Sequence, residues 1–160
     1  MHALTLLRAT ALGVVFALFG IQSAAQSTDP IVGTWELNVA KSKYSPGPAP
    51  KSESRTYMIA GQDIKATSKG VDGTGKPTAG EWTVNYDGKD RPQTGNPDAD
   101  ALSLKRIDAS TTEFTQKRAG KVVMTGTRTI SRDGKVMTIT TKGTNAKGQT
   151  INDMEVFEKR

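Results

Sequence analysis

The sequence predicts an all-β protein: a single up-and-down antiparallel β-barrel of about 8–10 strands, with little or no helix. Short segments alternate apolar and polar residues, and tight glycine-containing links of hairpin length join them. No segment shows a convincing apolar repeat of 3.6 residues, and the seven prolines fall at strand starts or in loops. A long meander would leave two exposed sheet edges unless it closed, so we expect a closed barrel.

Residues 1–25 have the pattern of a secretory signal peptide, which leaves 26–160 as one barrel domain. Arg8 precedes an apolar run over 11–21, and Ser23-Ala24-Ala25 supplies small residues for a peptidase. An uncleaved membrane anchor is the alternative, but the run is shorter than the ~20 residues that span a bilayer. We therefore expect a periplasmic or extracellular protein without stable membrane insertion.

Cleavage after Ala25 would remove the single histidine, His2, from a chain that has no cysteine. Catalytic sites of the Ser-His-Asp or Cys-His kind are then excluded, as are the usual zinc and haem sites. The formal net charge would fall from +6 to +5 with the loss of Arg8. The remaining Lys and Arg residues are scattered, so we expect no nucleic-acid partner.

Nine segments are expected to be strands, with a tenth if the signal around Thr78 extends. They are 31–38, 52–60, 63–68, 81–86, 101–107, 112–118, 121–131, 135–143 and 149–158. Two long loops are expected, over 40–51 and 87–100. Links such as Asp133-Gly134 are hairpin turns, where glycine accepts a positive φ.

Two stretches resemble the calycins, the superfamily of lipocalins, fatty-acid-binding proteins and avidins. Gly33-Thr34-Trp35 on the first strand is similar to the Gly-x-Trp motif of those barrels, and 156–160 is similar to the closing strand of fatty-acid-binding proteins. The chain resembles more closely a set of uncharacterised secreted bacterial lipocalin-like proteins that share its Gly-Thr-Trp, Ala-Lys-Ser-Lys and Ser-Pro-Gly-Pro segments. The resemblance implies that Gly33 and Trp35 form the barrel floor.

The closing strand departs from the fatty-acid-binding pattern where that family holds the ligand's carboxylate with Arg-x-Tyr. The matching positions here are Glu155 and Phe157. An acid there would repel a fatty-acid head group. The helical lid of that family is also absent from the expected elements, because the prolines of 45–50 prevent a helix.

Several side chains are candidates for lining a cavity. Tyr57, Trp82 and Tyr86 share apolar strand faces, and Arg128 follows Met124 on a face assigned also to Val122, Gly126 and Ile130. We favour Arg128 as a cover for Trp35, with a ligand contact as the alternative, and Arg106 beside Leu102 and Leu104 invites the same argument. The candidate ligand-binding residues are Tyr57, Trp82, Tyr86, Arg106, Met124, Arg128 and Ile139. A core filled by its own side chains stays an equal alternative.

The proline-rich loop around Tyr44, Pro46, Pro48 and Pro50 has two open interpretations, a surface connection or a lid over the barrel mouth. The acids of 96–100, with Asp87 and Asp90, lack any spacing typical of calcium loops, so we interpret them as turn residues and expect no metal. No cofactor is expected, because the glycines of 70–75 precede a strand rather than a helix.

These observations lead to three hypotheses. The first is an exported, non-enzymatic barrel that binds a small apolar or amphipathic ligand inside. The second is a protein-interaction barrel, an inhibitor or assembly factor with a filled core. The third is an enzyme that uses Asp, Glu or Tyr. The sequence does not indicate an oligomeric state.

Overall fold

A computed structural model describes residues 29–160. The expected signal peptide, 1–25, lies outside them. The described chain forms ten strands and one short 3-10 turn, η1 (Val39–Lys41). The strands are β1 (Gly33–Leu37), β2 (Ser52–Ala60), β3 (Asp63–Val71), β4 (Pro77–Val84), β5 (Arg91–Pro92), β6 (Ala101–Arg106), β7 (Thr111–Arg118), β8 (Lys121–Ile130), β9 (Val136–Thr144) and β10 (Thr150–Lys159). Within this part of the chain, no helix has the length and apolar character to cross a bilayer.

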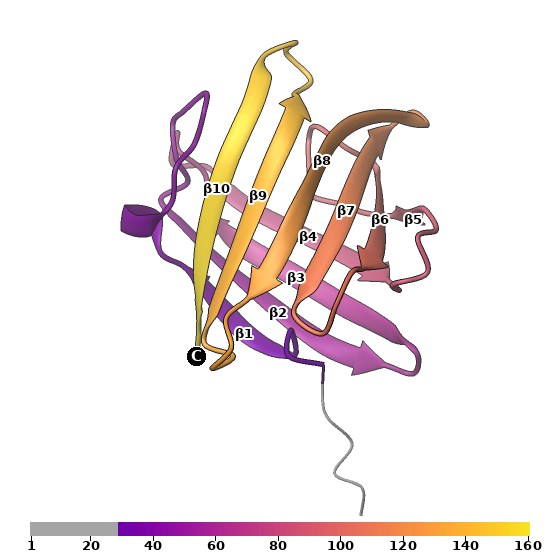
Figure 1. The fold of residues 1–160 in the computed structure, drawn as a ribbon. Helices are drawn as coiled ribbons and strands as arrows, with labels where there is room; N and C mark the ends of the chain where they lie inside the picture. The colour runs from indigo at the N-terminus through magenta and orange to yellow at the C-terminus, as the bar shows by residue number, and fades with distance from the viewer. Residues whose placement is uncertain (1–28) are drawn as a thin grey trace, which may run out of the picture.

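All ten strands belong to one antiparallel sheet in the order β4-β3-β2-β1-β10-β9-β8-β7-β6-β5. The first strand therefore lies between β2 and the last strand, β10, so that the first and last strands pair within the sheet. In Figure 1 the layer of β1–β4 crosses behind the layer of β6–β10. The prediction of an all-β antiparallel barrel is confirmed.

The barrel closes along a seam between β4 and the segment that follows β5. Trp82 and Gln93 form a single bridge across it, and the Thr94 amide donates to the carbonyl of Glu81 at 3.0 Å. The two backbones approach so closely that a Cβ on Gly80 would lie 2.8 Å from the carbonyl oxygen of Thr94. The seam is short, so backbone hydrogen bonds between strands run around most of the barrel but do not form a complete ladder here.

Two details of the strand prediction are wrong. The tenth strand is the two-residue β5, inside the expected second loop, whereas Thr78 belongs to β4. Val122 is 57% exposed and does not share the buried face of Met124. A register shift on β7 explains this, because Met124 pairs with Gln116 while Val122 pairs with the next residue, Lys117. The extra residue on β8 changes which face Val122 presents.

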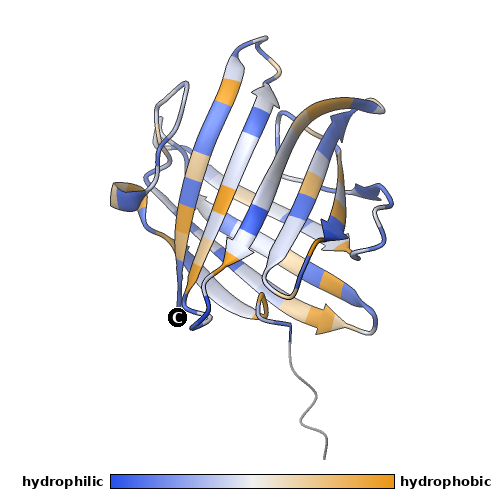
Figure 2. Cartoon of the chain, in the orientation of Figure 1, coloured by the Kyte–Doolittle hydropathy of each residue, from blue (hydrophilic) through white to orange (hydrophobic). Residues whose placement is uncertain are grey.

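Trp35 belongs to a group of large side chains that are fully buried in the core. Trp35 is fully buried and its indole Nε1 donates to the carbonyl of Ile31 at 2.7 Å. The largest fully buried side chains are Trp35, Phe157, Ile31, Met137 and Val84. Figure 2 shows hydrophobic and hydrophilic residues alternating along the strands, as a half-buried sheet requires. Trp35 is therefore part of the buried core, and its role with Gly33 as the barrel floor stays a prediction.

Candidate functional site

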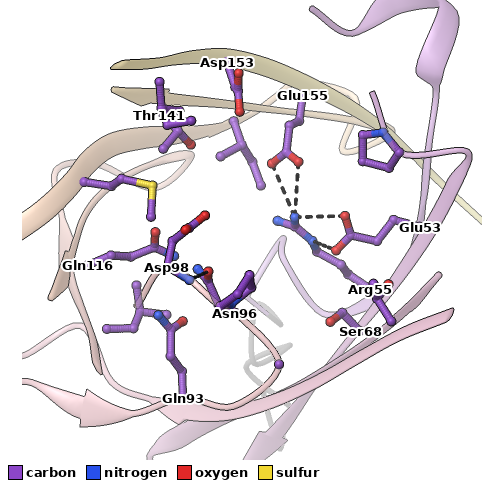
Figure 3. A pocket seen from close by; sticks show the side chains of 18 of the residues that line it. Glu53, Arg55, Ser68, Gln93, Asn96, Asp98, Gln116, Thr141, Asp153 and Glu155 are labelled. Carbon is purple, nitrogen blue, oxygen red and sulfur yellow. Dashed lines mark hydrogen bonds and ion pairs between the residues drawn. The ribbon is translucent and has the colours of Figure 1, made fainter. Parts of the chain in front are cut away.

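The barrel interior contains a partly open cavity of about 470 Å³ that reaches the loops at one end. This volume falls within the range of about 300–1,000 Å³ typical of small-molecule sites. The interior is therefore not filled by the protein's own side chains. Figure 3 shows the polar side chains that reach into it.

One wall of the cavity is largely apolar. It comes from the inward faces of β6 to β9, where alternate residues of each strand point toward the interior. The apolar lining residues on these strands are Leu102, Leu104, Phe114, Met124 and Ile139. Tyr57 and Trp82 continue the lining on β2 and β4, with their rings edge to face at 6.2 Å between centroids. Apolar ligand surface buried here would be stabilised by about 25 cal/mol per Å².

The opposite wall carries a cluster of charged residues centred on Arg55. Its Nε donates to Glu53 at 2.6 Å, and its Nη2 donates to the Glu155 carboxylate at 3.3 Å. The three side chains are only 14–17% exposed. In Figure 3 the two carboxylates reach Arg55 from different strands. The guanidinium also lies over the ring of Phe157, 4.5 Å from its centroid.

The electrostatics of this cluster follow from two acids sharing one base. Burial disfavours the charge on Arg55, but Glu53 and Glu155 outweigh it and raise the Arg55 pKa well above its usual value. Burial also raises the pKa of Glu155, and the nearby carboxylates of Glu53 and Asp153 raise it further against the opposing effect of Arg55. A single guanidinium therefore does not fully compensate the negative charge of this wall.

The proline-rich loop begins as an extension of the sheet along β10. Lys43 forms a bridge with Met154, and the Ser45 amide donates to the Asp153 carboxylate at 2.8 Å. The Tyr44 hydroxyl donates to Glu155 at 3.3 Å, and burial raises the pKa of Tyr44 far above its ordinary value of 10.0. From there the loop crosses to the turn after β3. Pro48 packs so closely on Gly73 in that turn that a Cβ on Gly73 would lie 2.6 Å from the proline ring.

The predicted lid residues all line the cavity: Tyr44, Pro46, Pro48 and Pro50. A second loop also covers this end. Asp98, in the segment after β5, accepts a hydrogen bond from the Ala146 amide at 2.8 Å in the turn between β9 and β10. Because Asn96 and Asp98 also line the cavity, the 87–100 loop contributes to the site rather than only to the surface.

Five of the seven predicted ligand-binding residues lie against the cavity. They are Tyr57, Trp82, Met124, Arg128 and Ile139. Tyr86 and Arg106 are not among the lining residues. Instead, the Arg106 guanidinium lies 3.8 Å from the centroid of the Tyr86 ring and pairs with Asp29. Their role as ligand contacts stays a prediction.

The favoured interpretation of Arg128 as the cover of Trp35 is wrong. Lys159 has that place, with its Nζ 5.0 Å from the centroid of the Trp35 ring and bonded to the carbonyl of Pro30 at 3.1 Å. Arg128 is 7% exposed, lies 5.7 Å from the Tyr57 ring and donates to the Tyr86 hydroxyl at 3.3 Å. Strand alternation indicates that Arg128 and Trp35 both point inward but not how deep each lies in the barrel.

The carboxylates of the second loop bond either within their own turn or to a turn elsewhere in the chain. Asp87 accepts from the Lys89 amide at 3.0 Å, and Asp100 accepts from the Ala119 amide at 2.9 Å. Across residues 29–160, no group of three or more acidic or histidine side chains is arranged to hold a metal ion. Asp87 thus matches the turn interpretation, whereas Asp98 and Asp100 hold other turns of the chain.

The charged cluster of Glu53, Arg55 and Glu155 was not predicted from the sequence. Glu53 and Arg55 share the strand face of Tyr57 at two-residue spacing, which was the available signal. Ile59 continues that spacing but is 53% exposed, since it lies near the end of β2 beyond the core. Asp153 lies two residues before Glu155 on β10 by the same rule.

No family model matches the chain, and no curated protein matches it. The resemblance to secreted bacterial lipocalin-like proteins therefore stays a prediction. Among solved structures, the zebrafish ileal bile acid-binding protein complexed with cholic acid is similar, with a TM-score of 0.46 and 12% identity. That alignment covers 82% of this chain and 99% of the other. A redesigned β-barrel, mFAP1, bound to DFHBI has a TM-score of 0.43 and 12% identity, over 81% of this chain and 95% of its own.

Those ligands belong to those two proteins. What the present barrel binds has to be inferred from its own cavity and side chains.

Proposed function

We propose that this protein is an exported, non-enzymatic barrel that binds a small amphipathic molecule in its interior. The observation that carries the proposal is the cavity of about 470 Å³ with one apolar wall and one charged wall. A molecule with both an apolar and a polar part would satisfy both walls, because charged groups must stay hydrogen-bonded when water is displaced. A cavity of this size also favours ligand binding over an interaction barrel with a filled core.

The loops at the open end fit the same proposal. The segment around Tyr44–Pro50 and the segment around Asn96–Asp98 both border the cavity, so a ligand would pass between them. Opening would break contacts such as that of Asp98 with the Ala146 amide. The floor around Trp35 stays in place.

Uptake of a neutral apolar dye tests the proposal. The protein, expressed from its full coding sequence, is titrated with Nile red, and co-purifying molecules are sought by native mass spectrometry. We expect a saturable rise in dye emission at one site per chain. Neither dye uptake nor a bound molecule would refute the proposal and favour the interaction barrel.

A matched pair of variants locates the site. Met124→Trp places a larger ring in the cavity and should lower Nile red affinity by about tenfold or more. Val122→Trp adds the same ring two residues away on an exposed position and should leave affinity unchanged. Thermal unfolding of both variants shows whether each still folds. Equal effects of the two variants would contradict interior binding.

Export is tested separately. If residues 1–25 are a signal peptide, the protein recovered from outside the cytoplasm should begin at Gln26. Intact-mass measurement reads this directly, and a secreted or periplasmic protein that retains Met1 would contradict cleavage.

A further inference from the structure

The lining of the cavity has a charge opposite to that of the protein. The whole chain carries a formal net charge of +6, yet the lining contains five acids and two bases. The acids are Glu53, Asp72, Asp98, Asp153 and Glu155, and the bases are Arg55 and Arg128. A cavity with low-dielectric walls focuses the field of its own charges, so the sign of the lining governs which ligands enter it.

Neither base is free to neutralise this excess. Arg55 is shared between Glu53 and Glu155, as described above. Arg128 donates its two hydrogen bonds to hydroxyls, those of Tyr86 and Thr112. Within residues 29–160, no Lys or Arg lies within ion-pair distance of Asp153 or Asp98.

Among residues 29–160, Asp98 and Asp153 have no Lys or Arg partner, and Glu155 shares Arg55 with Glu53. Asp153 and Glu155 are two residues apart on the same face of β10, and Asp98 approaches from the loop over the open end (Figure 3). Burial raises the pKa of both β10 carboxyls, which means that the cavity without ligand disfavours their charged form. A cation placed between them would remove that penalty.

We propose that the ligand is an amphipathic cation, an amine or quaternary ammonium with an apolar tail. Its charged group lies at Asp153 and Glu155, and its tail lies on the wall of Leu104, Phe114 and Ile139. This inference rests on the proposed function. The Tyr44 ring beside Glu155 adds a face suited to ammonium groups.

An anionic amphiphile is the opposing case, and Arg128 is the residue that would hold it. Arg128 is buried without a carboxylate partner, but its guanidinium faces the Tyr57 ring and already holds two hydroxyls. To reach it, an anion would pass the acids of the open end and of β10. This arrangement favours the cation.

Three ligands that differ only in the head group test which head-group charge the cavity prefers. Decylamine, decanol and decanoate, each below its micelle concentration at neutral pH, compete with Nile red for the protein. We expect decylamine to bind at least about tenfold more tightly than either of the others. Equal affinities, or tighter binding of decanoate, would overturn the cation assignment while leaving interior binding intact. Failure of Nile red itself would instead refute the proposed function.

Variants that keep shape but remove charge locate the head group. Glu155→Gln and Asp153→Asn should each weaken decylamine by about tenfold and leave decanol unchanged. Glu113→Gln removes an exposed acid from the outside of β7 and is the control for net charge. If all three variants weaken decylamine equally, or if neither β10 variant does, the assignment is overturned. Asparagine at 153 retains an acceptor for the Ser45 amide, and thermal unfolding shows that each variant is folded.

Discussion

The Nη2 atom of Arg55 lies 3.3 Å from the carboxylate of Glu155, although 100 residues separate them in the sequence. Strand β1 makes this contact possible, because it pairs with β2 on one side and with β10 on the other. The same guanidinium holds Glu53 on its own strand. The interaction therefore joins β2 to β10 across β1, and it lies inside the cavity rather than on the outer surface.

Replacing Arg55 with methionine should lower the free energy of unfolding by about 3 kcal/mol at neutral pH. The reason is that Glu53 and Glu155 would stay inside the barrel without a cation. Urea unfolding measures the loss. The surface pair of Lys41 and Glu158, with side chains 62% and 45% exposed, is the control, and Lys41→Met should cost less than about 1 kcal/mol.

A double variant separates charge from packing. Adding Glu155→Gln to Arg55→Met should restore part of the loss, because only Glu53 then stays unpaired. A double variant no more stable than Arg55→Met alone would mean that the arginine acts through its contact with the Phe157 ring instead.

The contribution of Glu155 to the free energy of unfolding should decrease as the pH rises. Its pKa in the folded protein is raised above the ordinary value of 4.5, first by burial, so the folded state holds this proton more tightly than the unfolded state. The contribution is fully present below about pH 4.5 and is lost as the pH rises through the folded pKa. Arg55, Glu53, Asp153 and Tyr44 are the charged or titratable groups that face it.

Urea unfolding of the wild type and of Glu155→Gln, from about pH 4 to about pH 8, measures this effect. The wild type should lose stability relative to the variant over that range. Asp108 is the control, because backbone hydrogen bonds lower its pKa below the ordinary value of 3.8, so its contribution is present over this whole range and is lost only at lower pH. A difference between wild type and Glu155→Gln that is flat or rises with pH would contradict the assigned shift.

The strands could be predicted because each is a local pattern. Alternation over 52–60 gave β2 its observed bounds, since a half-buried strand leaves a two-residue period in the sequence. Strand β5 leaves no such pattern in two residues, and its pairing depends on the neighbouring β6. The exposure of Val122 depends on a bulge, which is set by how β7 and β8 align and not by either segment alone.

Part of the cavity lining was predictable from the sequence, but the contacts among its charged side chains were not. Tyr57, Trp82 and Met124 follow from strand parity, which says that a side chain points inward but not what it meets. The partners of Arg55 and Lys159 depend on the order of strands in the sheet, and that order brings Glu155 and Trp35 to them. The cavity volume likewise depends on how far ten strands hold the walls apart.

Gly33→Ala should destabilise the protein by about 2 kcal/mol. Gly33 has φ +127°, and a Cβ there would lie 2.8 Å from Cε of Lys159, the side chain that covers Trp35. Gly134→Ala is the control, since its φ of +69° imposes left-handed strain without any neighbour within 4 Å. Chemical denaturation compares the two. If Gly33→Ala costs no more than Gly134→Ala, the contact with Lys159 does not explain the glycine of the Gly-x-Trp motif.

Gly95→Ala should open the seam between β4 and the segment after β5. Gly95 has φ +80°, and a Cβ would collide with the carbonyl of Ala79 on β4. The strand and the segment would then separate where the Thr94 amide donates to Glu81. Because this hydrogen bond contributes to the short closure of the barrel, amide exchange at Thr94 should become faster.

Hydrogen exchange followed by residue measures the change, with the Met154 amide, bonded to Lys43 on the far side of the barrel, as an internal reference. Gly148→Ala is the matched variant, because Gly148 has a similar φ of +76° but nothing within 4 Å of its Cβ position. Exchange at Thr94 should rise in Gly95→Ala and stay unchanged in Gly148→Ala. Faster exchange at Met154 as well would indicate general destabilisation, and the seam would then not be a locally opening element of the barrel.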